Sequence, residues 1–457
     1  MQDQPFRVIV IGAGPAGLYL ARALGAVKID YVVLERASAT FLERGNHLLL
    51  FPYTIRLLYQ IGLYDEAKKR LYKLHRKIDM MKTGYVLSDY AMWYLLEERH
   101  GYPTLPIQRY DVLEMFYKSI PNREHLIKTG AKAVSIKETD QGVEVELEDG
   151  TVETGSVVIG ADGVHGMTKK YIEEAVSKTA MEATATPLFD IPTTSQYYSI
   201  YAEGTNTKKI PSGTFYETRD TGRAIQLGAD NDKLRIIMYR KLPQQMTGPV
   251  SYTAEQMEEF AEALFDMAVA PGVSLGEIWA DFHKHTARLV NQNEGFAKHW
   301  HTGRVVITSD ASVCTSSVNG LGVNCGLHSS VALANQLQQA VLSSAGNPST
   351  ESLREAFARY QHIRARELKA IYHQAHSSMR QLTWDSWKDW FIDRFLRRWI
   401  GSDFLIRKYL NPLICKGQIL SYVPFEGVSA PLPWRRTPDV PIDEDKKSEA
   451  LMVGQAG

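Results

Sequence analysis

The sequence has few of the features that would place it in several common protein classes. Only three of its 457 residues are cysteines, Cys314, Cys325 and Cys415, and they form no paired framework. This favours a reducing compartment over a disulfide scaffold. The chain has 52 basic and 52 acidic residues, so its formal net charge of zero indicates neither nucleic acid nor an anionic membrane surface as a partner. No run of uncharged apolar residues is long enough to span a bilayer, so no transmembrane segment is expected.

Metal-ligand spacing is also missing. His283 and His285 have no acidic or cysteine partner spaced to complete a site, so no metal is expected. The chain enters a core strand at Val8, which predicts no signal peptide and a cytoplasmic protein, monomeric or homodimeric. The Trp-rich residues 384–399 fit either a membrane surface or a packed helical cap, and their mixed charge favours the cap.

What the sequence does have is a dinucleotide cradle at its start. Residues 8–11 form an apolar β-branched run, and Gly12, Gly14 and Gly17 follow at the spacing that permits a tight turn, a close approach to a pyrophosphate and close helix packing. A second apolar run, residues 31–34, ends in an acid that can accept the hydroxyls of a ribose. The residues expected to bind the cofactor here are Gly12, Ala13, Gly14, Ala16, Gly17, Glu35 and Arg36.

Three more segments extend this unit. Residues 157–163 form an apolar strand that ends in Gly-Ala-Asp-Gly, after an expected hairpin at residues 142–151. Residues 304–310 form another strand ending in a carboxylate, and the small residues 319–326 after it let a helix N-terminus approach a flat ring. Arg109 stands at an expected helix start beside the nucleotide groove.

In order and spacing, these motifs resemble the single-component FAD monooxygenases of the para-hydroxybenzoate hydroxylase fold. Within that fold, the chain looks most similar to the fungal FAD monooxygenases and epoxidases of meroterpenoid, indole-diterpene and indole-alkaloid pathways. That branch is supported by residues 61–65 and 235–243, by Glu294 and Gly295 before Trp300, and by residues 421–425. The resemblance covers roughly residues 5–430.

The resemblance implies an α/β fold: a Rossmann-type FAD-binding domain with an inserted mixed β-sheet substrate domain and C-terminal helices. The expected ranges are 1–184 and 291–342 for the FAD-binding domain, 185–290 for the substrate sheet, 343–434 for the helical cap and 435–457 for a disordered tail. Within the sheet, the strand-like runs are 195–201, 213–218, 223–228 and 234–239, and alternation places Tyr197, Ser199 and Tyr201 on one face and Gln196, Tyr198 and Ile200 on the other.

The resemblance also implies roles for particular residues. Glu35 would hold the adenosine ribose, and Arg109 and Asp310 would bind the ribityl-pyrophosphate part of FAD. Gly322, Val323 and Asn324 would lie by the pyrimidine edge of the flavin, and Leu49 stands where a glycine usually approaches it. Asp162, with Gly163, would serve both FAD and a transient NADPH; the alternative is a cap at a strand end.

Two residues are candidates for catalysis. Tyr216 falls near a functional tyrosine of the fungal branch and is expected to orient substrate or relay a proton, unless it is simply a packed sheet tyrosine. His47, which is new relative to the branch, is a candidate general acid or base because an unperturbed imidazole titrates near ~6.5. The alternative for His47 is a hydrogen bond to backbone.

Several positions depart from the family pattern, and they cluster near the flavin and NADPH sites. Ser309 and Val313 replace a glycine and a histidine, and the loop facing the reactive edge of the flavin has Ser316 and Ser317 instead of two prolines. Losing prolines frees two backbone amides and softens the loop. After the Gly-Ala-Asp-Gly motif, Gly166 and Lys169 replace a serine and an arginine.

The function that the resemblance implies is an NADPH- and O2-dependent oxidoreductase of secondary metabolism, a hydroxylase or epoxidase. It would act on a large, apolar, polycyclic small molecule through a C4a-hydroperoxyflavin. The altered loop leaves open a redox-neutral FAD-containing cyclase or isomerase in the same kind of pathway. A non-catalytic partner protein of the flavin fold is a third reading.

Overall fold

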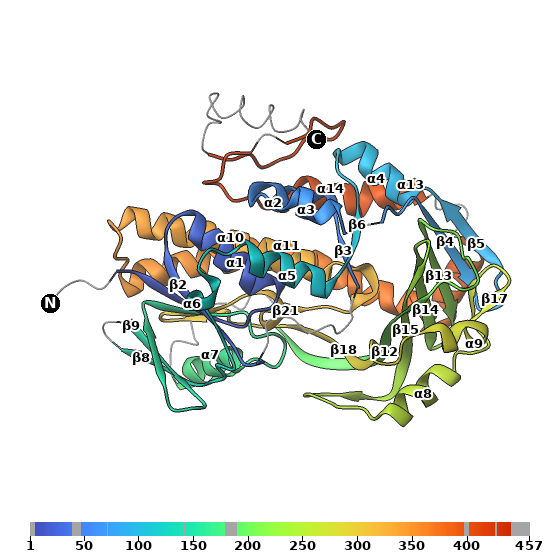
Figure 1. The fold of residues 1–457 in the computed structure, drawn as a ribbon, viewed down its shortest axis with the longest axis horizontal. Helices are drawn as coiled ribbons and strands as arrows, with labels where there is room; N and C mark the ends of the chain where they lie inside the picture. Colours follow the sequence, from blue (N-terminus) through green and yellow to red (C-terminus); the bar gives the residue numbers. More distant parts are fainter. Residues whose placement is uncertain are drawn as a thin grey trace.

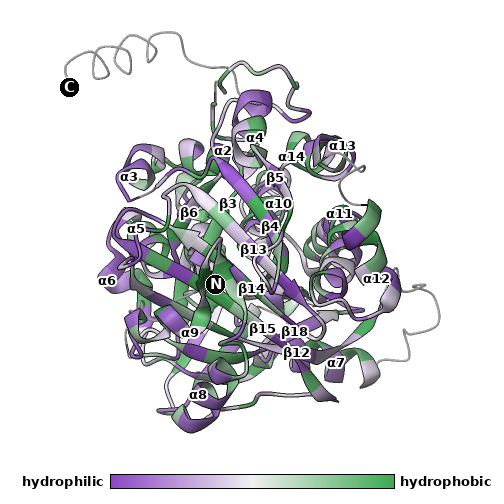
Figure 2. Ribbon diagram, turned by 90° about the vertical axis from the view of Figure 1, so that its right-hand side faces the viewer, coloured by the Kyte–Doolittle hydropathy of each residue, from purple (hydrophilic) through white to green (hydrophobic). Residues whose placement is uncertain are grey.

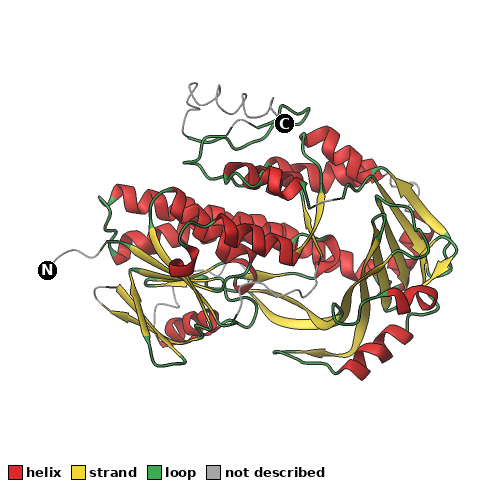
Figure 3. Cartoon of the chain, viewed as in Figure 1, coloured by secondary structure: helices red, strands yellow, loops and turns green. Residues whose placement is uncertain are grey.

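The computed structural model describes residues 5–38, 47–70, 72–139, 142–178, 190–396, 402–425 and 427–439. Figure 1 shows a nucleotide-binding part, on the left, joined to a large sheet on the right, with a layer of long helices running across both. In Figure 3 these long helices lie over one side of the strands. The expected α/β architecture is therefore confirmed.

The first sheet has six strands, of which five are parallel and the edge strand β19 is antiparallel to its neighbour. Their order across the sheet is β19 (His301–Thr302), β20 (Val305–Ile307), β11 (Val157–Gly160), β1 (Arg7–Ile11), β2 (Asp30–Glu35) and β7 (Ile127–Thr129). Their central residues are buried because both faces are covered, as is usual for parallel sheets.

Helices and a small sheet cover the two faces. One face carries α1 (Pro15–Ala26), α5 (Arg109–Ser119), α10 (Gly322–Ser343) and α11 (Thr350–Leu382) (Figure 1). The other carries α7 (Met167–Lys178) and the antiparallel strands β8 (Ala133–Thr139), β9 (Gly142–Leu147) and β10 (Val152–Gly155). The expected hairpin over residues 142–151 is confirmed by the β9–β10 pairing.

The second sheet has eight strands and carries the strand-like runs expected between residues 195 and 239. Its order is β21 (Val313–Cys314), β18 (Arg288–Phe296), β12 (Ile191–Thr205), β15 (Lys233–Met246), β14 (Arg223–Ala229), β13 (Thr214–Asp220), β4 (Arg76–Met81) and β5 (Val86–Tyr90). Only the β13–β4 pair is parallel. The sheet therefore extends beyond the expected range 185–290, because β4 and β5 come from much earlier in the chain.

Side chains alternate across β12 as expected from Tyr197 onward, but the prediction for Gln196 is wrong: it lies in a bulge between Ser195 and Tyr197, and its oxygen accepts from Arg380 of α11 at 2.7 Å. Tyr198 and Ile200 pack on the outer face in a cluster covered by α8 (Ala254–Glu262) and α9 (Leu275–Ile278). Tyr197 packs on the inner face against Met379 of α11. The sheet thus has an apolar layer on each side. In Figure 2, hydrophilic residues lie on the outward parts of α3 (Tyr64–Lys68), α6 (Arg123–Leu126) and α8.

The two long C-terminal helices begin at well-defined residues. α10 begins at Gly322, within the small residues 319–326 expected at a helix N-terminus, and α11 begins at Thr350, where the Ser349 hydroxyl accepts a hydrogen bond from the Ser352 amide. Short helices follow: α12 (Trp387–Phe391), η5 (Ile392–Leu396), α13 (Ser402–Leu405), η6 (Ile406–Leu410) and α14 (Asn411–Cys415). None of the described helices is both long and apolar enough to cross a membrane.

The expected disorder from residue 435 is wrong for its first five residues. The amides of Arg435 and Asp439 donate to the carbonyls of Cys415 and Ser421, and the guanidinium of Arg436 contacts Glu367 at 2.7 Å. Residues 440–457 lie outside the described part of the chain.

The remaining elements connect these layers. They are the strand pairs β3 (His47–Leu50) with β6 (Leu105–Gln108) and β16 (Ala268–Ala270) with β17 (Val273–Ser274), the helices α2 (Pro52–Gln60) and α4 (Met92–His100), and the short turns η2 (Trp279–Asp281), η3 (Ser309–Ala311) and η4 (Ser317–Asn319).

Candidate active site

The turn between β1 and α1 has the geometry that a pyrophosphate cradle requires. Gly12 has φ of +106°, and a Cβ there would lie 2.5 Å from the Ala161 carbonyl oxygen. A Cβ on Gly17 would lie 2.0 Å from the Gly12 carbonyl oxygen, so both glycines are sterically required. A Cβ on Gly14, in contrast, would meet nothing, and Gly14 and Ala16 line a cavity.

Glu35 closes this cradle at the end of β2. One carboxylate oxygen accepts from the Ala13 amide and the other from the Ala37 amide, each at 2.9 Å. These two bonds fix the carboxylate beside the cradle and leave it further lone pairs for ribose hydroxyls. The exposed side chain of Arg36 lines the same cavity, whereas Ala13 and Gly17 act through the backbone and through packing.

Arg109, at the start of α5, and Asp310, in η3, line the cavity on its other sides. Solvent reaches Asp310 through the cavity, but the protein encloses it, and this burial raises its pKa to about 6 although Arg109 opposes the shift. Burial lowers the pKa of Arg109, and the charges of Glu35 and Asp310 counteract this effect. One cation thus lies between two carboxylates in a space with room for a ligand.

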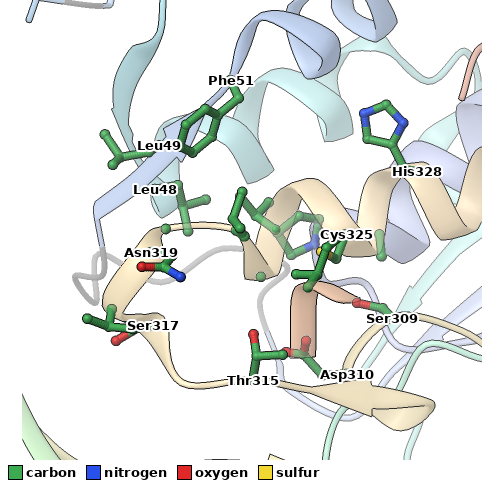
Figure 4. Close-up of a pocket in the computed structure, with 18 of the residues that line it drawn as sticks. Leu48, Leu49, Phe51, Ser309, Asp310, Thr315, Ser317, Asn319, Cys325 and His328 are labelled. Atoms are coloured by element: carbon green, nitrogen blue, oxygen red, sulfur yellow. The ribbon is translucent and has the colours of Figure 1, made fainter. Parts of the chain in front are cut away.

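The N-terminus of α10 and the loop before it form the next wall (Figure 4). Gly322 and Val323 line the cavity at this helix start, where free backbone amides favour a negatively charged group. Leu49 lies on β3 beside Gly320, whose added Cβ would come within 3.0 Å of it. Ser309 has φ of +58°, which explains why glycine is usual at this position.

The side chain of Asn324 faces away from the cavity, so only its backbone at the start of α10 could lie by the flavin. Its amide nitrogen donates to the carbonyls of Leu49 (2.7 Å) and Gly320 (2.9 Å). Its oxygen accepts from the Phe51 amide (3.0 Å) and the Thr54 hydroxyl (2.6 Å). The side chain is fully buried and does not line the cavity. Asn324 is a positioning residue, because it fastens β3 and the loop at Gly320 to α10.

His328 supports this arrangement from one helical turn away. Its Nδ1 accepts from the Gln418 amide at 2.9 Å, so Nε2 carries the proton and donates to the Thr54 hydroxyl at 3.3 Å. Tyr53 stacks on its ring, with the centroids 4.2 Å apart. Burial holds the pKa of His328 well below its usual value, so the ring is neutral and its tautomer is fixed.

The altered loop at Ser316 and Ser317 is held by hydrogen bonds that prolines do not make. The Ser317 amide donates to Gln292 at 2.9 Å, and the Ser317 hydroxyl lies 2.9 Å from the Tyr239 hydroxyl. The Ser316 hydroxyl is 3.4 Å from the Ala375 carbonyl of α11. The backbone amide that the missing proline frees at Ser317 therefore has a partner in Gln292.

Asp162 takes the role of a strand-end cap. One of its oxygens accepts from the amide (3.0 Å) and the hydroxyl (2.9 Å) of Thr168, at the start of α7. A Cβ on Gly166 would lie 2.1 Å from the Asp162 carboxyl carbon, which explains the glycine at this departure from the family pattern. Asp162 still borders the cavity, and burial raises its pKa.

His47, at the start of β3, does line the cavity. Its Nε2 lies 3.6 Å from a carboxylate oxygen of Glu203, on β12. Burial lowers the pKa of His47 to about 4, despite the raising effect of Glu203. Burial would raise the pKa of Glu203, but contacts with His47 and Lys233 hold it at about 2. His47 is therefore neutral near pH 7 and is a weak base, so it can form hydrogen bonds with a bound molecule but is not a source of protons.

Tyr216 is not at the cavity, so its expected role as a substrate-orienting residue is wrong. On β13 it points into the outer apolar cluster with Ile78 and Ile225, and only 3% of it is exposed. Alternation places its neighbours Phe215 and Glu217 on the cavity side instead.

A buried charged cluster, three members of which also line the cavity, was not predicted from the sequence. Arg219 contacts Glu217, lies 2.7 Å from Asp393 and 3.5 Å from Asp79, and Lys77 lies 3.1 Å from Glu217. Burial would lower the pKa of Arg219, but these carboxylates raise it. Three carboxylates and two cations share the cluster. The one sequence signal that indicates this cluster is the presence of charged residues at alternate positions of β4 and β13.

All these walls border one cavity of ≈ 1740 Å³, which extends from the cradle at Gly14 to an apolar wall that includes Tyr72, Trp93 and Phe215. The residues present fit FAD: open space at Gly14, an acid at the end of β2, and Arg109 with Asp310 at the centre. Among the described residues, no three His, Cys, Asp or Glu side chains lie close enough together to hold a metal ion.

This geometry defines a dinucleotide-binding enzyme fold, and comparison with known proteins specifies it. The family described as FAD binding domain matches residues 6–366. The FAD-dependent monooxygenase srdH of Neurospora crassa is 36% identical over 444 residues, which cover 94% of this chain and 99% of srdH. The FAD-dependent monooxygenase DEP2 of Alternaria brassicicola is 28% identical over 452 residues, covering 97% of this chain and 83% of DEP2.

Solved structures agree on the fold. The structure of Klebsiella pneumoniae HpxO, complexed with FAD and uric acid, superposes with a TM-score of 0.73 at 18% identity, covering 90% of this chain and 97% of that one. The structure of CtdE, in complex with FAD and a substrate, gives a TM-score of 0.67 at 14% identity, over 84% and 92% of the two chains. The chain belongs to the FAD-dependent monooxygenases. It is an enzyme, an oxidoreductase whose cofactor is FAD.

Proposed function

We propose that this enzyme is an NADPH- and O2-dependent monooxygenase that hydroxylates or epoxidises a bulky, largely apolar natural product. The observation that supports this most directly is the single cavity, which joins the FAD cradle to an apolar wall with Tyr72, Trp93 and Phe215. A site for a large apolar substrate needs both parts in one continuous cavity.

The expected stoichiometry follows from the class of reaction. NADPH supplies two electrons, one atom of O2 is inserted into the substrate, and the other leaves as water. FAD, when bound, supplies the redox chemistry, at its C4a position. The protein binds the cofactor through the cradle, keeps water from the reacting groups with the apolar wall, and orients the substrate.

Two further details belong to this proposal. His47, neutral and at the cavity, is positioned to form a hydrogen bond with a bound molecule. The three cysteines are buried and unpaired, which favours a cytoplasmic enzyme. The subunits are expected to be monomers or homodimers.

The test is turnover of the purified, FAD-containing enzyme with polycyclic terpenoid or indole substrates under isotopically labelled O2. We expect one labelled oxygen atom in the product and one NADPH consumed per product formed. Product formation without O2 and NADPH would instead identify a redox-neutral cyclase or isomerase. NADPH oxidation that no substrate couples to oxygen insertion would also overturn the proposal.

A further inference from the structure

One polar chain reaches the cavity through Ser317, on the loop shown in Figure 4. The Ser317 hydroxyl lies 2.9 Å from the Tyr239 hydroxyl, which lies 3.1 Å from Oε1 of Gln226. Nε2 of Gln226 lies 2.8 Å from a carboxylate oxygen of Glu217 and 3.0 Å from the Val318 carbonyl. Every link of this chain except Ser317 is buried.

The direction of the hydrogen bonds along this chain is determined. The Val318 carbonyl can only accept, so the nitrogen of Gln226 must face it, and the amide oxygen must face Tyr239. Leaving that buried oxygen without a donor would be costly, so the single proton of the Tyr239 hydroxyl is used there. Ser317 must then donate its own proton to Tyr239. Its remaining lone pairs are available only as acceptors.

The side-chain amide of Gln292 fixes the direction of the hydrogen bonds at Tyr201, which becomes a donor toward the cavity where Ser317 is an acceptor. The backbone amide of Ser317 can only donate, so it fixes the oxygen of Gln292 toward itself at 2.9 Å. Nε2 of Gln292 then donates to the hydroxyls of Ser199 (2.5 Å) and Tyr201 (2.9 Å). Tyr201 lines the cavity and accepts in this bond, so its own proton remains available to donate.

We propose that Ser317 and Tyr201 form an acceptor–donor pair that recognises the polar edge of the substrate. The side chain of Gln292 links the backbone amide of Ser317 to the Tyr201 hydroxyl, and both residues line the same cavity. The matching group donates a hydrogen bond to Ser317 and accepts one from Tyr201. A secondary lactam, with its N–H beside its C=O, has this pattern.

The inference rests on the proposed function for the location of the substrate, and it specifies the class of that substrate. An otherwise apolar polycycle that carries a lactam edge would be oriented relative to the flavin by this pair. A hydrophobic wall alone cannot orient a flat molecule in this way, whereas paired buried polar groups discriminate strongly against analogues that leave them unpaired.

Equilibrium binding to the oxidised, FAD-loaded full-length enzyme tests the pair without any turnover. The probes are the tricyclic lactam phenanthridinone and its N-methyl derivative, which keeps the carbonyl and loses the donor. Binding is followed by isothermal titration calorimetry. We expect the lactam to bind roughly three- to tenfold more tightly, the effect of one neutral hydrogen bond. In Ser317→Ala, the ratio of the two affinities should fall to the value that the extra methyl group alone produces by its size.

The chain offers a matched control and an independent variant. Ser316→Ala removes the adjacent hydroxyl, which faces the Ala375 carbonyl and not the cavity, and should keep the preference. Tyr239→Phe leaves the Ser317 hydroxyl in place but free to reverse its direction, so the preference should shrink while binding persists. Flavin content verifies that each variant is folded.

Three results would overturn the pair: no saturable binding of the lactam, equal affinities of the two probes in the unmodified enzyme, or an unchanged preference in both Ser317→Ala and Tyr239→Phe. None of these depends on NADPH or O2. A failure of the pair is therefore distinguishable from a failure of the monooxygenase proposal.

Discussion

Asn324→Asp tests whether this residue positions the flavin wall through its four hydrogen bonds. Aspartate has the same shape and keeps the two bonds accepted from Phe51 and Thr54. Its second oxygen, however, faces the carbonyls of Leu49 and Gly320 at the distances of 2.7 and 2.9 Å that the amide nitrogen now spans. The new carboxylate oxygen then faces two carbonyl oxygens in a fully buried place, and none of the three atoms can donate a hydrogen bond.

The cost can be worked from these contacts. Each carbonyl left without its donor costs about 1–3 kcal/mol, so the ionised variant should lose roughly 4 kcal/mol of unfolding free energy at pH 7. Protonation restores a donor, so the folded variant holds a proton that the unfolded chain releases, and its carboxyl pKa is raised. The penalty therefore shrinks as pH falls, by up to about 1.4 kcal/mol for each pH unit over which the folded carboxyl is protonated while the unfolded one is ionised.

The assay is denaturant unfolding of the FAD-loaded proteins at pH 5 and pH 7. Asn324→Ala serves as the control, because it loses all four bonds without adding a titratable group. Only Asn324→Asp should recover stability, relative to the unmodified protein, at the lower pH. A variant as stable as the unmodified protein at pH 7, or a gap that does not change with pH, would refute the reasoning.

Three further outcomes are expected. Ser309→Gly should raise the unfolding free energy by about 1 kcal/mol. Removing the strain of a left-handed serine gains about 1–2 kcal/mol, which exceeds the cost of the added conformational entropy of glycine in the unfolded chain. A lower unfolding free energy of this variant in chemical denaturation would contradict the prediction. Arg219→Ala should cost about 3–5 kcal/mol, since it leaves Glu217, Asp79 and Asp393 buried without their shared cation, and calorimetric unfolding measures it. In the FAD-free protein, Asp310 has a pKa raised to about 6, so its contribution to stability is present at low pH and is lost as pH rises from about 4 to 6; Asp310→Asn should remove this part of the pH dependence of the melting temperature, and an unchanged profile would count against it.

The nucleotide cradle could be predicted from sequence because its requirements are local. Gly12 makes the tight turn, Gly17 permits the close helix and Glu35 lies beside the turn at the end of β2, since all three are set within about thirty residues. Asn324 was placed correctly at the helix start, but the sequence does not tell which way an amide side chain faces. Three of its four partners, Leu49, Phe51 and Thr54, lie some 270 residues away in the chain.

The substrate side was harder to predict because it depends on non-local pairing. Tyr216 and Phe215 are both apolar and both sit on a strand covered on each face, so alternation alone does not tell which one meets the cavity. Gln226 and Gln292 look like ordinary sheet residues, and their importance comes from the groups across the sheet that each amide joins.

The composition of the eight-stranded sheet limits how this enzyme can be rebuilt. β4 and β5 enter the sheet from residues 76–90, and β21, paired with β18, leads directly into the loop of Ser317. A graft of the middle segment from a relative would therefore separate strands that share one hydrogen-bonded register. Swapping substrate preference by recombination needs crossover points that carry residues 72–90 and 288–319 along with the middle segment, so the natural unit of exchange is discontinuous in the gene.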